Sequence, residues 1–183
     1  MIVFTDLDGT LFDSYRIKKC CMADWLKVYT EAPIMPGAPE AIAKLNDMGC
    51  NCMAITARGQ VFSPIEHAMT KSALKKYFKR GHIKGLIWHV RNKCESIMSE
   101  HDDIAQDLRD NSTIEDAILI DDDLKQVSAA AYGGIFTILF GRDDEELRKE
   151  YPSTLRVAMN WPEAVKIIEE RMIERGLLNN EKQ

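Results

Sequence analysis

Short apolar runs of strand length alternate with longer amphipathic stretches along most of the chain. Because the short runs are rich in β-branched and aromatic residues, they indicate buried strands. These strands are expected at residues 2–5, 50–56, 86–90, 117–120 and 135–139, with a shorter one at 155–159. Helical spacing of apolar residues predicts helices at 16–30, 40–48, 63–79, 93–108, 124–132 and 161–175. Such alternation predicts an α/β fold, in which helices cover both faces of a parallel sheet.

The first strand runs directly into two carboxylates, Asp6 and Asp8, and then into Gly9. Because side chains alternate along a strand, residues two apart start on the same side. In an open parallel sheet, ligands bind beyond the carboxyl ends of the strands. Two like charges held this closely repel each other unless a cation lies between them, and Mg²⁺ prefers carboxylates together with phosphate oxygens. The alternative is an Asp-rich turn in which Gly9 supplies the bend.

The run Asp6-Leu-Asp-Gly-Thr-Leu11 resembles the first motif of the haloacid dehalogenase-like (HAD) hydrolase superfamily, and further elements follow in that family's order. Thr56 ends a hydrophobic strand, as in the second motif. Asp121-Asp122-Asp123 follows the predicted fourth strand, as in the last motif, although Asp122 or Asp123 could instead cap the next helix. The resemblance implies a Rossmann-like (HAD-like) parallel sheet with its first and fourth strands adjacent at the centre.

The resemblance also implies a magnesium-dependent phosphatase that works through an aspartyl phosphate. Asp6 would be the nucleophile, and Asp8 the general acid and then the general base. Asp6, the backbone carbonyl of Asp8 and Asp122 would hold Mg²⁺, with Asp121 as a further metal residue. The family often has an acidic residue four positions after Asp122, and this chain has Gln126 there.

The remaining parts of the expected site hold the phosphoryl oxygens. Thr56 would do so through its hydroxyl group, and Ala57 and Arg58 through the backbone N–H groups that follow it. The third motif of the family is a Lys or Arg upstream of the fourth strand, and Lys93 is the favoured candidate. Three other cations remain alternatives: Lys84, Arg91 and Lys125.

Chain length limits what can cover this site. A length of 183 residues favours one domain. Residues 14–32 leave room for one short helical insertion rather than a large cap, and the polar tail at 179–183 is expected to be disordered. An open site, or one closed in a homo-oligomer, suits a nucleotide, the phosphorylated end of a polynucleotide, or a sugar phosphate. The rival hypothesis is a non-catalytic binding protein with the same fold.

Composition narrows the class of protein further. The chain is 45% hydrophobic and 29% charged, which is typical of a soluble globular protein. No apolar run has the length of a membrane span and no leader precedes the first strand, so a cytoplasmic location is expected. The five cysteines are expected to be reduced thiols. The net charge of −5 argues against general coating of nucleic acid.

A local basic stripe departs from this acidic balance. Lys71, Lys75 and Lys79 recur every four residues in the helix predicted after Thr56, with Lys76 and Arg80 beside them. This spacing places them along one helix face, where they could guide a polyanion whose terminal phosphate enters the site. The alternative is a solvated face that acidic neighbours balance.

Overall fold

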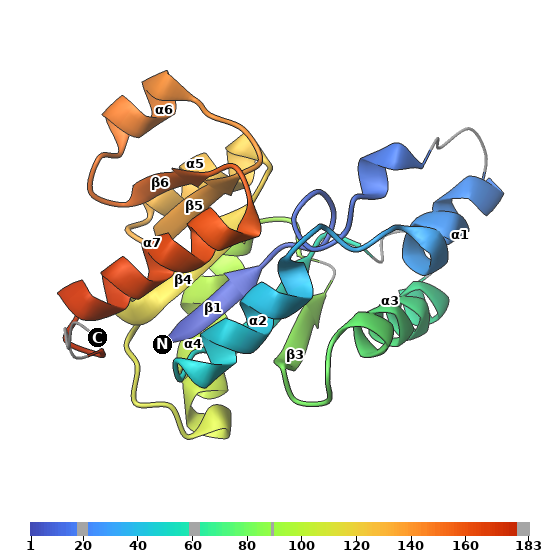
Figure 1. Cartoon of the computed structure of the whole chain (residues 1–183), viewed down its shortest axis with the longest axis horizontal. Coiled ribbons are helices and arrows are strands. Elements are labelled where there is room, and N and C mark those ends of the chain that lie inside the picture. The colour runs from blue at the N-terminus through green and yellow to red at the C-terminus, as the bar shows by residue number, and fades with distance from the viewer. Residues whose placement is uncertain (18–21, 59–62, 89, 179–183) are drawn as a thin grey trace.

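A six-stranded parallel sheet forms the centre of the computed structural model, which describes residues 1–17, 22–58, 63–88 and 90–178 (Figure 1). The strand order is β3-β2-β1-β4-β5-β6, so β1 and β4 are adjacent at the centre, as predicted. The strands are β1 (Ile2–Thr5), β2 (Asn51–Thr56), β3 (Ile83–Trp88), β4 (Ala117–Asp121), β5 (Phe136–Phe140) and β6 (Leu155–Ala158). The predicted α/β class with a parallel sheet is therefore confirmed.

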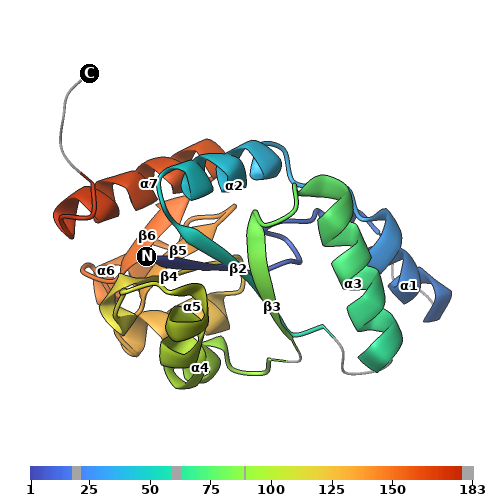
Figure 2. The same cartoon turned by 90° about the horizontal axis from the view of Figure 1, so that it is seen from below.

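Helices cover both faces of the sheet (Figure 2). On one face lie α2 (Ala38–Asp47) and α7 (Trp161–Glu174), and on the other lie α4 (Lys93–Leu108) and α5 (Leu124–Tyr132). Beyond the β3 end of the sheet, α1 (Met22–Glu31) packs against α3 (Ser63–Tyr77). Short helical segments complete the described structure: Ser14–Arg16, Ile114–Asp116 and α6 (Glu145–Glu150).

The central strands are buried along their whole length because helices lie on both of their faces. Every residue of β1, β4 and β5 is buried. Such strands carry continuous apolar runs instead of alternating patterns, which is the signal that the sequence shows. None of the helices formed by the described residues is long and apolar enough to cross a membrane.

Two of the predicted elements differ clearly in their boundaries, while most of the others differ by only one or two residues at an end. The structure places β3 at Ile83–Trp88 and not at 86–90, so Gly85 lies inside the strand instead of before it. A Cβ atom on residue 85 would lie 2.6 Å from the Cε atom of Met53 on β2, so glycine gives Met53 the space it needs there. The expected helix at 16–30 is also wrong at its start, because Arg16 ends a separate 3₁₀ turn.

Three further outcomes complete the comparison with the predicted elements. The sequence pattern missed α6, whose N-terminus is capped by the side chain of Asp144. The predicted starts of α4 and α5 are confirmed. The expected tail at 179–183 lies outside the described residues, as do Cys20 and Cys21, while the other three cysteines are free and buried: Cys50, Cys52 and Cys94.

Candidate active site

The pairing of β1 with β4 brings two carboxylates to the same edge of the sheet. Thr5 pairs with Ile120, and the Asp6 backbone N–H continues the ladder by donating to the Ile120 carbonyl at 2.9 Å. Asp6 and Asp121 are the next residues of the two strands, so both lie at the carboxyl end of the sheet. Ligands bind at this edge in open α/β folds. The register of two buried strands therefore fixes the position of the candidate site.

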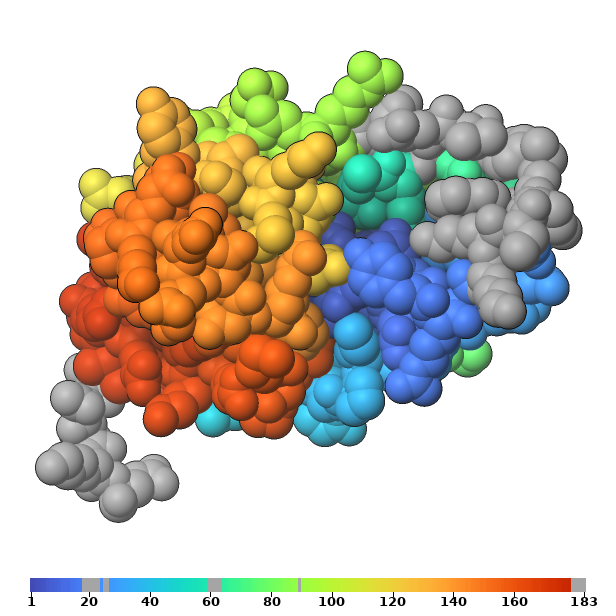
Figure 3. All heavy atoms as spheres, turned by 90° about the horizontal axis from the view of Figure 1, so that it is seen from above, coloured from blue at the N-terminus to red at the C-terminus, as the bar shows by residue number. Residues whose placement is uncertain are grey.

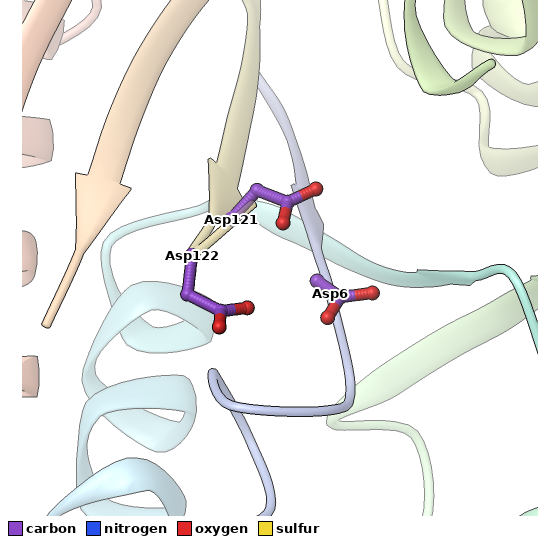
Figure 4. Close-up of side chains that lie close together, drawn as sticks. All are labelled: Asp6, Asp121 and Asp122. Atoms are coloured by element: carbon purple, nitrogen blue, oxygen red, sulfur yellow. The ribbon is translucent and has the colours of Figure 1, made fainter. Parts of the chain in front are cut away.

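Asp122 joins these residues to form a cluster of three carboxylates. One oxygen from each of Asp6, Asp121 and Asp122 lies within 4.8 Å of the others, and all three side chains point toward one region (Figure 4). This is a donor set of hard oxygen atoms, the type that Mg²⁺ takes. The cluster could thus hold a metal ion.

Tyr15 contacts this cluster from the segment that follows β1. Its hydroxyl group donates a 2.7 Å hydrogen bond to Asp122, across a sequence separation of 107 residues. Figure 3 shows this meeting of distant segments, with the residues after β1 in blue beside those after β4 in yellow. No local sequence pattern indicates this role of Tyr15, because the contact spans such a large separation along the chain.

Lys93 lies between two of the three carboxylates. Its Nζ atom is 2.5 Å from Asp6 and 2.6 Å from Asp121, and its side chain is only 4% exposed. Because Lys93 is the first residue of α4, its position depends on the start of that helix. The Asn92 side chain caps this start by accepting from the Glu95 N–H, as N-cap residues do.

Gln126 also fixes the start of α4. Its side-chain oxygen accepts from the Lys93 N–H at 3.0 Å, and its amide nitrogen donates to the Arg91 carbonyl at 2.9 Å. The residue that departs from the family pattern thus links α5 to the segment that carries Lys93. From the sequence alone, Gln126 indicated only the loss of a carboxylate at this position.

Burial and the charges of neighbouring residues shift the pKa values of the residues in this cluster. The pKa of Asp6 is raised from 3.8 to about 7: burial is the largest cause, Lys93 opposes it, and the nearby Asp121 and Asp8 add to it. Burial also raises the pKa values of Asp121 and Asp122. For Lys93, burial lowers the pKa, but Asp6 and Asp121 more than offset this, so the pKa is raised and the ammonium group stays charged.

The Asp8 side chain binds Arg58, whereas Asp6 and Asp121 bind Lys93. Arg58 binds the Asp8 carboxylate through two parallel hydrogen bonds, from Nε at 2.8 Å and from Nη2 at 2.7 Å. Such a bidentate pair orients the carboxylate and favours its ionised form, so Asp8 must gain a proton before it can act as an acid. Asp8 is therefore outside the three-carboxylate cluster, although it follows Asp6 by only two residues.

The Arg58 side chain is itself buried among groups that hold it in place. Its guanidinium carbon lies 4.9 Å from the ring centre of Tyr29 and 5.5 Å from that of Phe12, and Nη1 donates to Thr70 at 3.4 Å. Tyr29 in turn donates to Glu66 at 3.0 Å. Residues of α1 and α3 thus support the guanidinium group that orients Asp8.

Thr56 lies at the carboxyl end of β2, level with the turn that carries Asp6 and Asp8. It is buried, and its hydroxyl oxygen accepts a 3.1 Å hydrogen bond from the Arg58 N–H. Ala57 is exposed. The structure therefore brings the second predicted motif beside the first, but one of its expected anion donors, the Arg58 N–H, already has a partner.

Solved structures share this fold. A D,D-heptose 1,7-bisphosphate phosphatase from Burkholderia thailandensis aligns with 92% of this chain and 97% of its own, at 19% identity and a TM-score of 0.63. A haloacid dehalogenase-like family hydrolase from Streptococcus pneumoniae aligns with 91% of this chain and 97% of its own, at 14% identity and a TM-score of 0.62. The chain has a HAD-like fold.

A third structure with this HAD-like fold contains ligands. It is a D,D-heptose 1,7-bisphosphate phosphatase from B. bronchiseptica in complex with magnesium and phosphate, which aligns with 93% of this chain and 98% of its own, at 18% identity and a TM-score of 0.59. No protein-family model matches the sequence, and no curated protein matches it. The similarity is therefore one of fold.

Of the four candidate cations, the structure places Lys93 in the carboxylate cluster of this HAD-like fold. The other three candidates are exposed: Lys84 on β3, Arg91 before α4, and Lys125 on α5. Asp123 caps α5 through hydrogen bonds from the N–H groups of Lys125 and Gln126. The capping alternative is thus correct for Asp123, while Asp121 and Asp122 point into the cluster.

Gly9 is the turn residue on which the cluster depends. Its φ of +85° favours glycine, and a Cβ atom added there would lie 2.6 Å from the Cγ atom of Asp122 and 2.7 Å from Cε2 of Tyr15. We therefore expect Gly9→Ala to displace Asp122 and to lower both stability and any metal affinity of the cluster. Gly49→Ala is the matched control, because Gly49 has a φ of +88° and open space around it.

Both variants should lose about 1–2 kcal/mol of unfolding free energy from the positive φ alone. Urea denaturation measures this loss, and titration with Mg²⁺ measures metal affinity. Only Gly9→Ala should show weaker metal binding. Equal metal affinity in Gly9→Ala and wild type would mean that Asp122 is not held by this close packing.

Proposed function

We propose that this protein is a magnesium-dependent phosphomonoester hydrolase that acts through an aspartyl phosphate. The observation that carries the proposal is the position of Asp6 at the end of β1, where Asp121, Asp122 and Lys93 surround it. A nucleophile for phosphoryl transfer needs nearby cations that offset charge repulsion and hold the phosphoryl oxygens. Magnesium and phosphate bound to a structure of the same fold support this proposal.

In this proposal the metal belongs to the three-carboxylate cluster. Asp6 and Asp122 would hold Mg²⁺, with Asp121 beside them and the backbone carbonyl of Asp8 as a further oxygen donor. The chemistry of the donor set fits, because all of these donors are oxygen atoms and the cluster carries excess negative charge. When bound, the ion would neutralise charge between the carboxylates and the phosphate.

The reaction would proceed in two balanced steps. In the first, an Asp6 oxygen forms a bond to phosphorus, the bond to the ester oxygen breaks, and Asp8 gives a proton to the departing alcohol. In the second, water attacks phosphorus while Asp8 takes its proton, the bond to the Asp6 oxygen breaks, and phosphate leaves. Lys93 and the Thr56 hydroxyl group would hold the phosphoryl oxygens, and Arg58 would orient Asp8.

We consider two alternative classes of substrate. We propose that the segment at 14–32 is a short insertion and not a large cap, so that the site would admit a nucleotide or the phosphorylated end of a polynucleotide. Sugar phosphates are the alternative, and structural neighbours that are heptose bisphosphate phosphatases favour them. With no cap, a sugar-phosphate enzyme would need a second copy of the chain to close the site.

Hydrolysis of a generic aryl phosphate tests the proposed reaction. Wild type should release phosphate with Mg²⁺ and stop when EDTA removes the metal. Asp122→Ala should raise the half-saturating Mg²⁺ concentration by roughly tenfold or more, because it removes a hard oxygen ligand. Asp103→Ala is the matched control, since Asp103 is an exposed carboxylate on α4 away from the cluster. An unchanged half-saturation in Asp122→Ala would place the metal elsewhere.

A further inference from the structure

The predicted basic stripe forms one wall of a groove that is separate from the carboxylate cluster. This groove has a volume of about 730 Å³ and lies between the C-terminal half of α3 and the first half of β3. We call it the basic groove. Its five cationic lining residues are Lys71, Lys75, Lys79, Arg80 and Lys84. Its apolar lining residues are Leu74, Phe78, Ile83 and Leu86.

The cations that line the groove differ from those predicted for the basic stripe. Helix α3 ends at Tyr77, so Lys79 and Arg80 lie in the connection to β3 and not on the helix. Lys76 does not line the groove, and its Nζ atom lies 4.8 Å from the ring centre of Tyr77. Lys84 of β3 joins from the opposite wall. The cations therefore face one groove from two elements, which a helix-only pattern could not indicate.

Acidic neighbours do not balance these charges. All five cations are exposed, and within residues 1–17, 22–58, 63–88 and 90–178 none of them forms an ion pair. The carboxylate of α3 is Glu66, in the first turn of the helix, and it accepts from Tyr29. A lysine in the last turn of a helix can stabilise the helix dipole. This gives Lys75 a structural reason to be cationic, but it does not apply to Lys71 or Lys84.

The chemistry of the groove favours an occupant that has both repeated negative charges and flat apolar parts. Lys71 and Lys75 are one turn apart, roughly 6 Å along the helix, so successive cations can contact successive phosphates of an extended strand. Of the apolar lining residues, Ile83 and Leu86 are half-buried, so their exposed parts offer an apolar surface to the bases. Leu74 and Phe78 are buried in the core. A second copy of the chain is a poor occupant, because two-fold pairing of β3 edges would bring like charges together.

We propose that the basic groove binds a single nucleic-acid strand whose phosphorylated end reaches the Asp6 site. Because α3 connects two parallel strands, it runs from the carboxyl edge of the sheet toward the amino edge, and α3 lies alongside β3 (Figure 2). The groove thus lies at the far end of a helix roughly 22 Å long. Several nucleotides must therefore connect groove and site. The binding itself does not require catalysis, whereas the phosphorylated end as substrate rests on the proposed function.

The first test measures binding without chemistry. Fluorescence anisotropy follows a labelled oligothymidylate of about twelve nucleotides that lacks a terminal phosphate, at salt concentrations from about 50 to about 200 mM. The triple variant Lys71→Ala, Lys75→Ala, Lys79→Ala should bind about tenfold or more weakly, and the slope of log affinity against log salt should decrease by about 2. Lys84→Gln, on the opposite wall, should also weaken binding.

A control triple variant removes the same charge elsewhere. Lys44 on α2, Lys149 on α6 and Lys166 on α7 are exposed lysines. They pair with glutamates on α7, α6 and α7, respectively. Their replacement by Ala should leave oligonucleotide affinity within about twofold of wild type. Equal losses in the two triple variants would overturn the proposal. Equal competition by polyglutamate of the same charge would also overturn it, because the groove would then take an acidic peptide.

The second test separates this proposal from the proposed function. The ratio of kcat/KM for a terminally phosphorylated oligonucleotide to that for a mononucleotide should exceed one, and should fall in the groove triple variant and in high salt. Aryl phosphate hydrolysis without oligonucleotide binding overturns the groove proposal alone. Groove-dependent binding by a protein that hydrolyses no phosphate ester supports the groove and overturns the proposed function.

Discussion

Asp6→Asn is expected to lower kcat for aryl phosphate hydrolysis by more than about a thousandfold, because an amide cannot serve as the nucleophile. The fold should survive this change. Asp6 follows β1 without belonging to its apolar run, and its backbone N–H, which pairs with Ile120, is retained in the variant. The Lys93 ammonium group keeps Asp121 as a partner at 2.6 Å. Circular dichroism and thermal unfolding check that the structure is retained.

Stability against pH gives a second readout that does not depend on catalysis. The folded state raises the pKa of Asp6 from 3.8 to about 7, so it favours the protonated carboxyl group. The corresponding stability is present at low pH and is lost as pH rises toward about 7, up to about 4 kcal/mol for this group. In EDTA, wild type should therefore lose unfolding free energy between about pH 4 and about pH 7, and Asp6→Asn should lose less.

Two controls decide whether the nucleophile is correctly assigned. Mass spectrometry must show that the variant has not deamidated back to aspartate. Asp13→Asn, a substitution in the same N-terminal segment, should keep wild-type turnover. Activity of Asp6→Asn within tenfold of wild type would contradict the proposed mechanism.

The fold and the position of the cluster follow from features that a sequence displays. Buried parallel strands carry apolar runs, and Asp6 and Asp121 each stand at the end of such a run, so the sequence indicates that they meet once β1 and β4 are adjacent. Lys93 was predictable for the same reason, because its place at the start of α4 follows from the N-cap residue Asn92. These inferences use residues that directly follow an apolar run or lie beside a helix cap.

The contacts of side chains with distant partners could not be predicted in the same way. Arg58 was expected to act through its backbone N–H, but its guanidinium group binds Asp8 because Tyr29 and Thr70 hold it in that direction. Gly85 lies inside β3, where it leaves space for the Met53 side chain of the neighbouring strand. Such contacts depend on tertiary packing, which local periodicity does not encode.

Lys93→Met is expected to lower kcat by about a hundredfold to a thousandfold, because it removes a buried cation from the side of the developing phosphoryl charge. Methionine has a similar length and an apolar stem, so the space that Lys93 fills remains occupied. The half-saturating Mg²⁺ concentration should not rise, because the lost group is a cation that repels the metal. This combination separates Lys93→Met from Asp122→Ala, in which metal affinity and turnover change together.

Lys125→Met and Arg91→Met are the matched controls for Lys93→Met. Both residues are exposed cations near the same ends of α4 and α5, and both were candidates for the role given to Lys93. Each should keep wild-type turnover, since neither contacts Asp6 or Asp121 in the structure, whereas Lys93 lies within 2.6 Å of both. A large loss in Arg91→Met together with near-normal turnover in Lys93→Met would transfer the phosphate-holding role to Arg91. The proposal of a metal in the three-carboxylate cluster would then still hold. Arg91, however, could contact the substrate only after the segment before α4 has moved.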